Sequence, residues 1–224
     1  MSYILYSYYR SSASYRVRIA LAVKGVEYEY VPVHLLDGGG QHLLPEYRAL
    51  NPLGELPALV VPRADGSRAV LGQSVAILEY LEEVHPEPAL MPRDAIERAR
   101  VRQLVEGVNS SIQPYQNLNL LRKLTADFGP DTARNEAWVR HYIGRGFAGL
   151  EALLVQSAGT HALGDTLTLA DVMLVPQVYN ARRFALDLAP YPTIVRVTDA
   201  ANALPAFRAA APEAQPDAPP PGAG

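Results

Sequence analysis

The sequence contains no cysteine among its 224 residues. Without cysteine the chain cannot form a disulfide framework, a thiolate zinc site or an iron–sulfur cluster. It also has no thiol of its own that could act as a nucleophile. Any thiol chemistry at this protein must therefore use a sulfur atom that a bound molecule brings.

A strong charge asymmetry is also missing. The chain has 20 Lys and Arg against 23 Asp and Glu, a formal net charge of −3, whereas nucleic-acid-binding proteins usually present a strongly basic face. No apolar run approaches the ~20 residues that a membrane-spanning helix needs. Residues 1–12 lack the apolar centre of a secretory signal. We therefore expect a protein with no nucleic-acid partner, no membrane association and a cytoplasmic location.

The first 85 residues alternate between strand-like and helix-like patterns. Short runs rich in Tyr, Val and Leu are bounded by turn residues, and the segments between them space their apolar residues as helices do. Pro32 indicates that the second strand lies at a sheet edge, because proline cannot donate to a ladder on both sides. The predicted order is strand, helix, strand, helix, strand, strand, helix, at residues 3–8, 11–24, 28–33, 43–50, 56–61, 68–71 and 74–85.

The rest of the chain predicts helices. Prolines 86 and 88 separate an α/β domain, residues 1–85, from an all-helical domain, residues 92–211. Thr168-Leu-Ala-Asp171 is typical of a capping box at a helix start, and Pro176 is expected to kink or end that helix. Residues 212–224 carry five prolines in 13 positions, which predicts a disordered tail.

The most specific chemical feature is the run Ser11-Ser-Ala-Ser-Tyr-Arg-Val-Arg-Ile-Ala-Leu21, which crosses the predicted turn from the first strand into the first helix. Hydroxyls at a helix N-terminus lie beside free backbone N–H groups and the positive end of the macrodipole, and both favour an anion. The run therefore predicts a site for a negatively charged ligand. The simpler alternative is that Ser11 or Ser12 only caps the helix, as most serines at such positions do.

This run resembles the signature of the zeta-class glutathione transferases, in which a Ser-Ser-Cys-x-x-Arg-Val-Arg-Ile-Ala-Leu string opens the first helix. The resemblance covers essentially the whole chain except the tail. Further matching motifs are Ala49-Leu-Asn-Pro52, Leu56-Pro57, Gln73-Ser74, Gln113-Pro-Tyr-Gln-Asn117, Gly164-Asp165, Thr168-Leu-Ala-Asp171, Val175-Pro-Gln-Val178 and Asp187-Leu-Ala-Pro-Tyr-Pro192.

The resemblance implies an architecture and an activity. It implies a thioredoxin-like α/β N-terminal domain that binds glutathione, an all-α C-terminal domain that supplies most of an acidic-substrate pocket, and a homodimer. The implied activity is the glutathione-dependent cis–trans isomerisation of a maleyl keto acid, by reversible addition of the thiolate to the cis double bond. Two alternatives stay open. One is a transferase or dehalogenase that consumes glutathione on small α-halo acids, and the other is a binding protein without catalysis.

In this family pattern Ser11 donates a hydrogen bond to the glutathione sulfur and favours its thiolate, with Ser12 as the alternative donor. The chain departs from the signature at Ala13, where the family has cysteine. No role of that cysteine can therefore operate here. The isomerisation does not require it, because glutathione brings its own sulfur.

The resemblance also implies the remaining glutathione contacts. Gln73 and Ser74 match the pair that binds the γ-glutamyl end, and Leu56 precedes a proline that the family keeps cis, so that the Leu56 backbone pairs with the tripeptide. His42 stands where relatives often have Gln. The other implied contacts, in the serine run and in a stretch that one subunit can offer to the other, are Ala13, Ser14, Tyr15, Arg16, Gln113, Asn117, Leu118 and Asn119.

The substrate side of the expected site depends on arginine. A guanidinium presents paired donors that match a carboxylate, and it stays protonated. Arg10 directly precedes the serine pair, and Arg183 aligns with the family's substrate-carboxylate arginine, with Arg182 as the reserve. We therefore expect Arg10 and Arg183 to be catalytic together with the serines. Arg16 and Arg18, inside the first helix, are interpreted as structural or pocket-rim residues.

Two other kinds of site are not indicated. The five histidines show no metal-ligand spacing, so no metal is expected. The tyrosines of the first strand, which include Tyr8 and Tyr9, are interpreted as core and cleft lining rather than as a tyrosine that activates a thiol.

Overall fold

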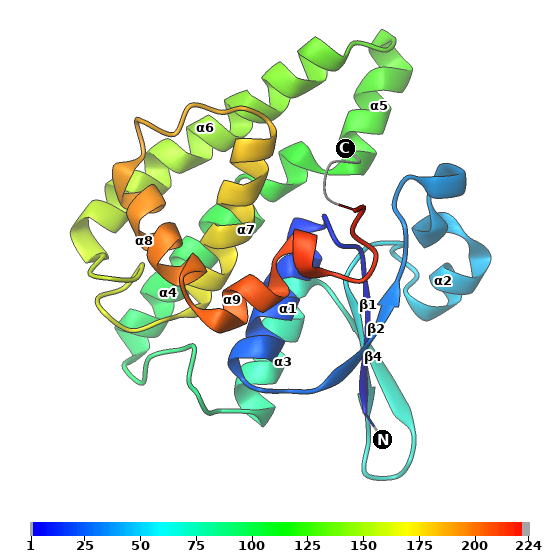
Figure 1. Cartoon of the computed structure of the whole chain (residues 1–224), viewed down its shortest axis with the longest axis horizontal. Helices are drawn as coiled ribbons and strands as arrows, with labels where there is room; N and C mark the ends of the chain where they lie inside the picture. The colour runs from blue at the N-terminus through cyan, green and yellow to red at the C-terminus, as the bar shows by residue number, and fades with distance from the viewer. Residues whose placement is uncertain (1, 221–224) are drawn as a thin grey trace. The chain divides into compact units, whose positions relative to one another are not determined.

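The computed structural model describes residues 2–220, which form two compact units. The first unit combines residues 2–88 with residues 204–220, and the second is residues 89–203 (Figure 1). The first is an α/β unit and the second is helical, as the sequence predicts. The chain differs from the expected helical domain at its end, because residues 204–220 belong to the α/β unit.

The first unit is built on a four-stranded sheet in the order β2-β1-β3-β4. Its strands are β1 (Tyr3–Ser7), β2 (Tyr28–Pro32), β3 (Ala58–Pro62) and β4 (Arg68–Gly72). β1 runs parallel to β2 and antiparallel to β3, and β3 runs antiparallel to β4. Pro32 ends β2 at the sheet edge, so the prediction from the proline is confirmed.

Helices cover both faces of this sheet. α1 (Ser12–Val23) and α3 (Ser74–Val84) lie on one side, and α2 (Pro45–Leu50) lies on the other (Figure 1). α1 packs against α3 and against α9 (Pro205–Ala210), which is why most of its side chains are buried. Two short 3₁₀ turns, η1 (Asp37–Gly39) and η2 (Gln41–Leu43), precede α2.

The second unit is a helical bundle around α7. Its helices are α4 (Ala95–Asn109), α5 (Leu118–Phe128), α6 (Thr132–Ser157), α7 (Leu169–Arg183) and α8 (Pro192–Asn202), with the 3₁₀ turn η3 (Gln113–Gln116) before α5. α7 packs against α4 and α8, and most of its residues are buried. No helix among residues 2–220 is long and apolar enough to span a bilayer.

The start of α7 confirms the predicted capping box. The Asp171 carboxylate accepts hydrogen bonds from the Thr168 backbone N–H at 2.9 Å and from its hydroxyl at 3.1 Å, and it also accepts from the Ala162 N–H at 2.8 Å. Of the two outcomes predicted for Pro176, a kink or a helix end, the second does not occur, because α7 continues to Arg183. Packing on both sides keeps the helix intact where proline removes one backbone donor.

The prediction of a disordered tail at residues 212–224 is wrong for residues 212–220. Pro212–Ala214 form the 3₁₀ turn η4, and the Gln215 amide donates to two backbone carbonyls near the end of α9. Hydrogen bonds from polar side chains and backbone groups order this segment. The prediction of disorder was wrong because it considered only the proline content and the lack of large apolar residues. The last four residues of that prediction lie outside the described part of the chain.

Candidate functional site

Ser11, the first residue of the serine run, lies in the turn between β1 and α1. The Ser11 N–H donates to the Tyr8 carbonyl at 3.0 Å, and the Ser11 Oγ accepts the Ser14 N–H at 3.2 Å. Ser11 is therefore the N-cap of α1. Accepting this bond uses a lone pair of Oγ, so the hydroxyl proton can still be donated to a ligand. Capping and ligand binding are compatible roles for this residue.

Exposure distinguishes the residues of the serine run. Ser11 and Ala13 are partly exposed, whereas Ser12 is buried. The side chains of Ser14, Tyr15 and Arg16 are also buried, inside the α/β unit. Contact of these residues with glutathione stays a prediction, and their burial indicates that the three side chains also support the turn.

A buried arginine connects the starts of α1 and α3. The Arg16 Nη1 donates to the Ser74 Oγ at 3.1 Å, and both side chains are buried. Ser74 is the first residue of α3, where backbone N–H groups point out of the helix. A guanidinium beside a helix N-terminus makes the site more favourable for a carboxylate. This geometry fits the γ-glutamyl carboxylate that the family resemblance assigns to Gln73 and Ser74.

Gln73 has a left-handed backbone, with φ 65°. Such a conformation is costly for residues other than glycine and is typical of functional sites. The Gln73 Nε2 donates to the Glu55 Oε2 at 2.7 Å, and the Glu55 carbonyl accepts from the Tyr47 hydroxyl at 2.7 Å and the Asn51 Nδ2 at 2.8 Å. Sequence reasoning assigned no role to Glu55, although it directly precedes the Leu56-Pro57 motif.

Replacing Gln73 with glycine should separate stability from binding. Glycine adopts this φ without a steric penalty, so the free energy of unfolding should stay the same or rise by up to ~1 kcal/mol. Glutathione affinity should fall about tenfold, because the amide contact is lost. Chemical denaturation and calorimetric titration measure the two quantities.

Gln73→Ala is the matched control for this prediction. It removes the same amide but keeps a Cβ on the strained backbone, so it should weaken binding with no gain in stability. If the glycine variant is less stable than the alanine variant, the backbone of Gln73 is not strained in the folded protein.

The loop before β3 carries another predicted contact. The Leu56–Pro57 peptide bond is cis, as the resemblance implied. The Leu56 side chain packs against a buried cluster that includes Tyr47, and this contact fixes the loop to the core of the first unit. His42 is buried in η2. Gly40 has φ 113°, and a Cβ there would lie 2.5 Å from the His42 ring and 2.9 Å from the Leu35 carbonyl oxygen, so glycine is favoured at position 40.

The tyrosines near the turn have a structural role. Tyr8 is buried between the rings of Tyr9 and His34, at centroid distances of 4.7 and 4.8 Å. Burial raises the pKa of the Tyr8 phenol to about 12, although Arg10 acts in the opposite direction. The phenol therefore keeps its proton at neutral pH and supplies no phenolate.

In the second unit, the predicted residues around η3 lie close together. The Asn117 Oδ1 caps α5 by accepting the Asn119 N–H at 2.9 Å. The Gln116 Nε2 donates to the Gln113 Oε1 at 3.1 Å and to the Gln177 Oε1 on α7 at 2.7 Å. This buried amide pair fixes η3, with Gln113 and Asn117, against the central helix of the unit.

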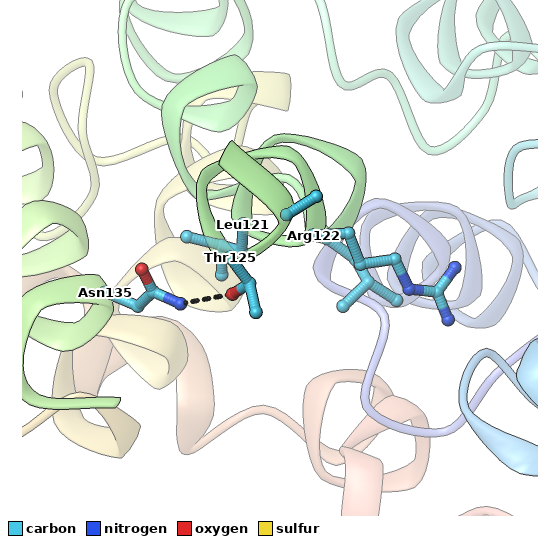
Figure 2. Close-up of a pocket in the computed structure, with 6 residues that line it drawn as sticks. Leu121, Arg122, Thr125 and Asn135 are labelled. Atoms are coloured by element: carbon cyan, nitrogen blue, oxygen red, sulfur yellow. Dashed lines mark hydrogen bonds between the residues drawn. The ribbon is translucent and has the colours of Figure 1, made fainter. Parts of the chain in front are cut away.

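A pocket of about 400 Å³ lies between α5 and α6. It is lined by Leu118, Leu121, Arg122, Thr125, Ala126 and Asn135. The Asn135 Nδ2 donates to the Thr125 Oγ1 at 3.0 Å, and Arg122 points away from this pair (Figure 2). Of the residues implied in this region, only Leu118 lines the pocket, and Arg122 is a cation that sequence reasoning did not consider.

The arginines predicted for the substrate have different surroundings. Arg182 forms an exposed ion pair with Asp199, with an N–O distance of 3.1 Å. Arg183 is the last residue of α7, and its guanidinium lies 4.3 Å from the centroid of the Phe184 ring. Arg10 lies next to Ser11 in the turn, and its guanidinium carbon is 5.8 Å from the centroid of the Tyr9 ring. Arg183 is not among the residues that line the pocket between α5 and α6.

Residues 5–89 match the family model of the glutathione S-transferase N-terminal domain, and residues 120–209 match that of the C-terminal domain. Maleylacetoacetate isomerase of Dictyostelium discoideum is 48% identical over 217 residues, 97% of this chain and 96% of the relative. A bacterial maleylpyruvate isomerase structure of the zeta class superposes with TM-score 0.90 at 48% identity, covering 96% of this chain and all of its own.

This chain belongs to the zeta class of the glutathione S-transferases. The two-unit architecture confirms the predicted fold class of the family. A third relative is the maleylacetoacetate isomerase structure from Anaeromyxobacter dehalogenans, with TM-score 0.87 and 49% identity over 98% of each chain. That structure holds dicarboxyethyl glutathione and citrate in its active site.

In the described part of the present transferase, no three His, Cys, Asp or Glu side chains are arranged to hold a metal ion.

Proposed function

We propose that this chain is a glutathione-dependent cis–trans isomerase that converts maleylacetoacetate into fumarylacetoacetate. The observation that carries the proposal is the serine turn at the N-terminus of α1, in a chain that matches maleylacetoacetate isomerases over nearly its whole length. Because the chain has no cysteine, the sulfur of this chemistry must come from glutathione.

The residues of the first unit fit glutathione. The α3 N-terminus with Ser74 and Arg16 favours the γ-glutamyl carboxylate, and Gln73 and the Leu56 backbone add polar contacts. Bound glutathione supplies a thiolate that adds reversibly to the cis double bond, so that the bond turns single, rotates and re-forms as trans. Ser11 donates its hydroxyl proton in a hydrogen bond to the sulfur and so favours the thiolate.

In this proposal Arg10 and Arg183 bind the substrate. Their guanidinium groups pair with the substrate carboxylates and stabilise the negative charge that develops on the substrate during addition. The relative that holds dicarboxyethyl glutathione and citrate in its active site supports such a site, because both ligands add carboxyl groups to it. The similarity to a maleylpyruvate isomerase supports maleylpyruvate as a second candidate substrate.

The first test is a progress curve with glutathione well below the substrate concentration and a fumaryl-product hydrolase as the coupling enzyme. Complete conversion of maleylacetoacetate is expected, since an isomerase regenerates glutathione in every turnover. Faster conversion of maleylpyruvate would make that the substrate. Conversion that stops when glutathione is exhausted would instead identify a transferase, such as one acting on α-halo acids. Glutathione binding without conversion would overturn the proposal.

Arg183→Ala should lower kcat/KM for the maleyl substrate about thirtyfold, ~2 kcal/mol, because a carboxylate contact is lost. Glutathione affinity should stay within twofold, since Arg183 acts on the substrate. Initial rates and calorimetry check both expectations. Arg182→Ala is the matched control, because the Arg182 ion pair with Asp199 is exposed and contributes little. Weaker glutathione binding in the Arg183 variant would contradict its assignment.

We further propose a cytoplasmic homodimer that acts in the breakdown of aromatic amino acids. Family membership supports this assembly, and in it Gln113 and Asn117 would approach the partner's glutathione. Gel filtration with light scattering should give twice the chain mass of 24.4 kDa. A monomer would exclude any role of these two residues across subunits.

A further inference from the structure

The C-terminal segment contacts the chain directly before the serine turn. After α9 it turns back toward the sheet (Figure 1), and the Asp217 carboxylate lies between two donors. Asp217 Oδ2 accepts the Tyr9 N–H at 3.0 Å, and Oδ1 accepts the Tyr30 hydroxyl at 2.6 Å. Tyr9 is two residues before Ser11. A residue near the end of the chain thus hydrogen-bonds the backbone that leads into the candidate catalytic turn.

Arg18 holds the carbonyl group of the same peptide unit, at Tyr8, and that of the next unit, at Tyr9. Its Nη2 donates to the Tyr9 carbonyl at 2.8 Å, and its Nη1 donates to the Tyr8 carbonyl at 3.3 Å. Its Nε donates to the Ala210 carbonyl at 3.0 Å, at the end of α9. The backbone at Tyr8 and Tyr9 is therefore fixed through its carbonyls by Arg18 and through an N–H by Asp217.

Charge favours this arrangement. Arg18 is fully buried, and burial lowers the pKa of its guanidinium, while Asp217 and three tyrosines act in the opposite direction. A carboxylate that accepts an N–H and an O–H forms charge-assisted hydrogen bonds, which are shorter and stronger than neutral ones. Gln215 fixes the segment by donating to two carbonyls, so Asp217 has little freedom to leave its donors.

We propose that Asp217 is a positioning residue, which holds the β1–α1 turn so that the Ser11 hydroxyl is directed at the glutathione sulfur. The inference rests on the proposed function, because it assigns Ser11 that role. Asp217 itself touches neither glutathione nor substrate in this proposal. It acts through the Tyr9 N–H, and small displacements of a catalytic group are known to cost up to about 10²-fold in rate.

The test compares Asp217→Ala with Asp65→Ala in the full chain. Asp65 is a matched control, since its carboxylate also accepts one backbone N–H, at 2.9 Å, and one hydroxyl, at 2.6 Å, but both come from Ser67 in the β3–β4 turn. Asp217→Ala should lower kcat about tenfold at neutral pH and leave KM for the maleyl substrate within twofold. Asp65→Ala should leave both constants within twofold.

Two conservative variants keep the proposal testable if Asp217→Ala folds poorly. Asp217→Asn retains an acceptor oxygen for the Tyr9 N–H, so it should recover most of kcat. Tyr30→Phe removes the other donor and leaves the Tyr9 contact, so its kcat should fall by no more than about threefold. A role in stability alone predicts that kcat, corrected for the folded fraction, is unchanged in every variant, and that result would overturn the proposal.

The spectrum of the bound thiol separates this inference from the proposed function. Ultraviolet difference spectra of the glutathione complex report the thiolate fraction without any substrate. In Asp217→Ala the thiolate should appear at higher pH than in the wild type, with glutathione affinity within about threefold. If the wild type fails to isomerise but this shift occurs, the proposed function fails and the positioning role stands. An unshifted thiolate profile in Asp217→Ala would overturn the positioning role even if the wild type isomerises.

Discussion

Ser11→Ala should lower kcat/KM for the maleyl substrate about 10²- to 10³-fold at neutral pH, a loss of ~3–4 kcal/mol of transition-state stabilisation. The hydroxyl is expected to lower the pKa of the glutathione thiol, and cysteine-type thiols titrate near ~8.5 without such help. The rate of the variant should therefore keep rising at a pH where the wild-type rate is already constant. Measurement of kcat/KM across neutral and alkaline pH shows this difference directly.

A control is needed because Ser11 also caps α1. Loss of the cap should cost ~1 kcal/mol of the free energy of unfolding, which leaves the protein folded. Asp94→Ala removes the cap of α4, whose Oδ1 accepts the N–H groups of Ile96 and Glu97, and should cost a similar amount with activity unchanged. If Ser12→Ala causes the larger loss of activity, Ser12 and not Ser11 is the hydrogen-bond donor.

The sequence predicted the α/β unit well because its signals are local. Strand and helix periodicity, together with the edge proline Pro32, is enough to give the element order and the edge position of β2. The tail could not be predicted in this way, because its order depends on specific hydrogen-bond partners, of which Tyr9 and Tyr30 lie far away in the chain. Gln215 and Asp217 bond to backbone and side-chain groups that composition does not reveal.

The candidate site also has a part that local sequence signals predict and a part that they do not. The serine turn was predictable, since a strand, a hydroxyl run and a helix follow one another in the chain. The contacts that support it join residues far apart, such as Arg16 with Ser74 at a separation of 58 residues and Tyr9 with Asp217 at 208. Only the folded chain brings such pairs together, which is why Asp217 received no role from the sequence.

Arg18→Met should destabilise the protein by ~3–5 kcal/mol. Arg18 is fully buried, and its guanidinium donates to the Ser7 Oγ, at 3.1 Å, and to three backbone carbonyls. Methionine fills similar space but donates no hydrogen bond, so these buried acceptors lose their partner and the Asp217 carboxylate loses a neighbouring cation. Chemical denaturation followed by far-ultraviolet circular dichroism gives the free energy of unfolding.

Arg100→Met is the matched control, because Arg100 forms an exposed i,i+3 ion pair with Glu97 and should cost less than ~1 kcal/mol. Comparing the double variant with the two single variants tests whether Arg18 and Asp217 act together. Arg18 and Asp217 both bind the Tyr8–Tyr9 peptide unit, so the double variant Arg18→Met with Asp217→Ala should lose less stability than the two single losses added together. Additive losses would mean that the two side chains stabilise the turn independently. In that case the burial of Arg18 next to the turn would have to be explained without any coupling to Asp217.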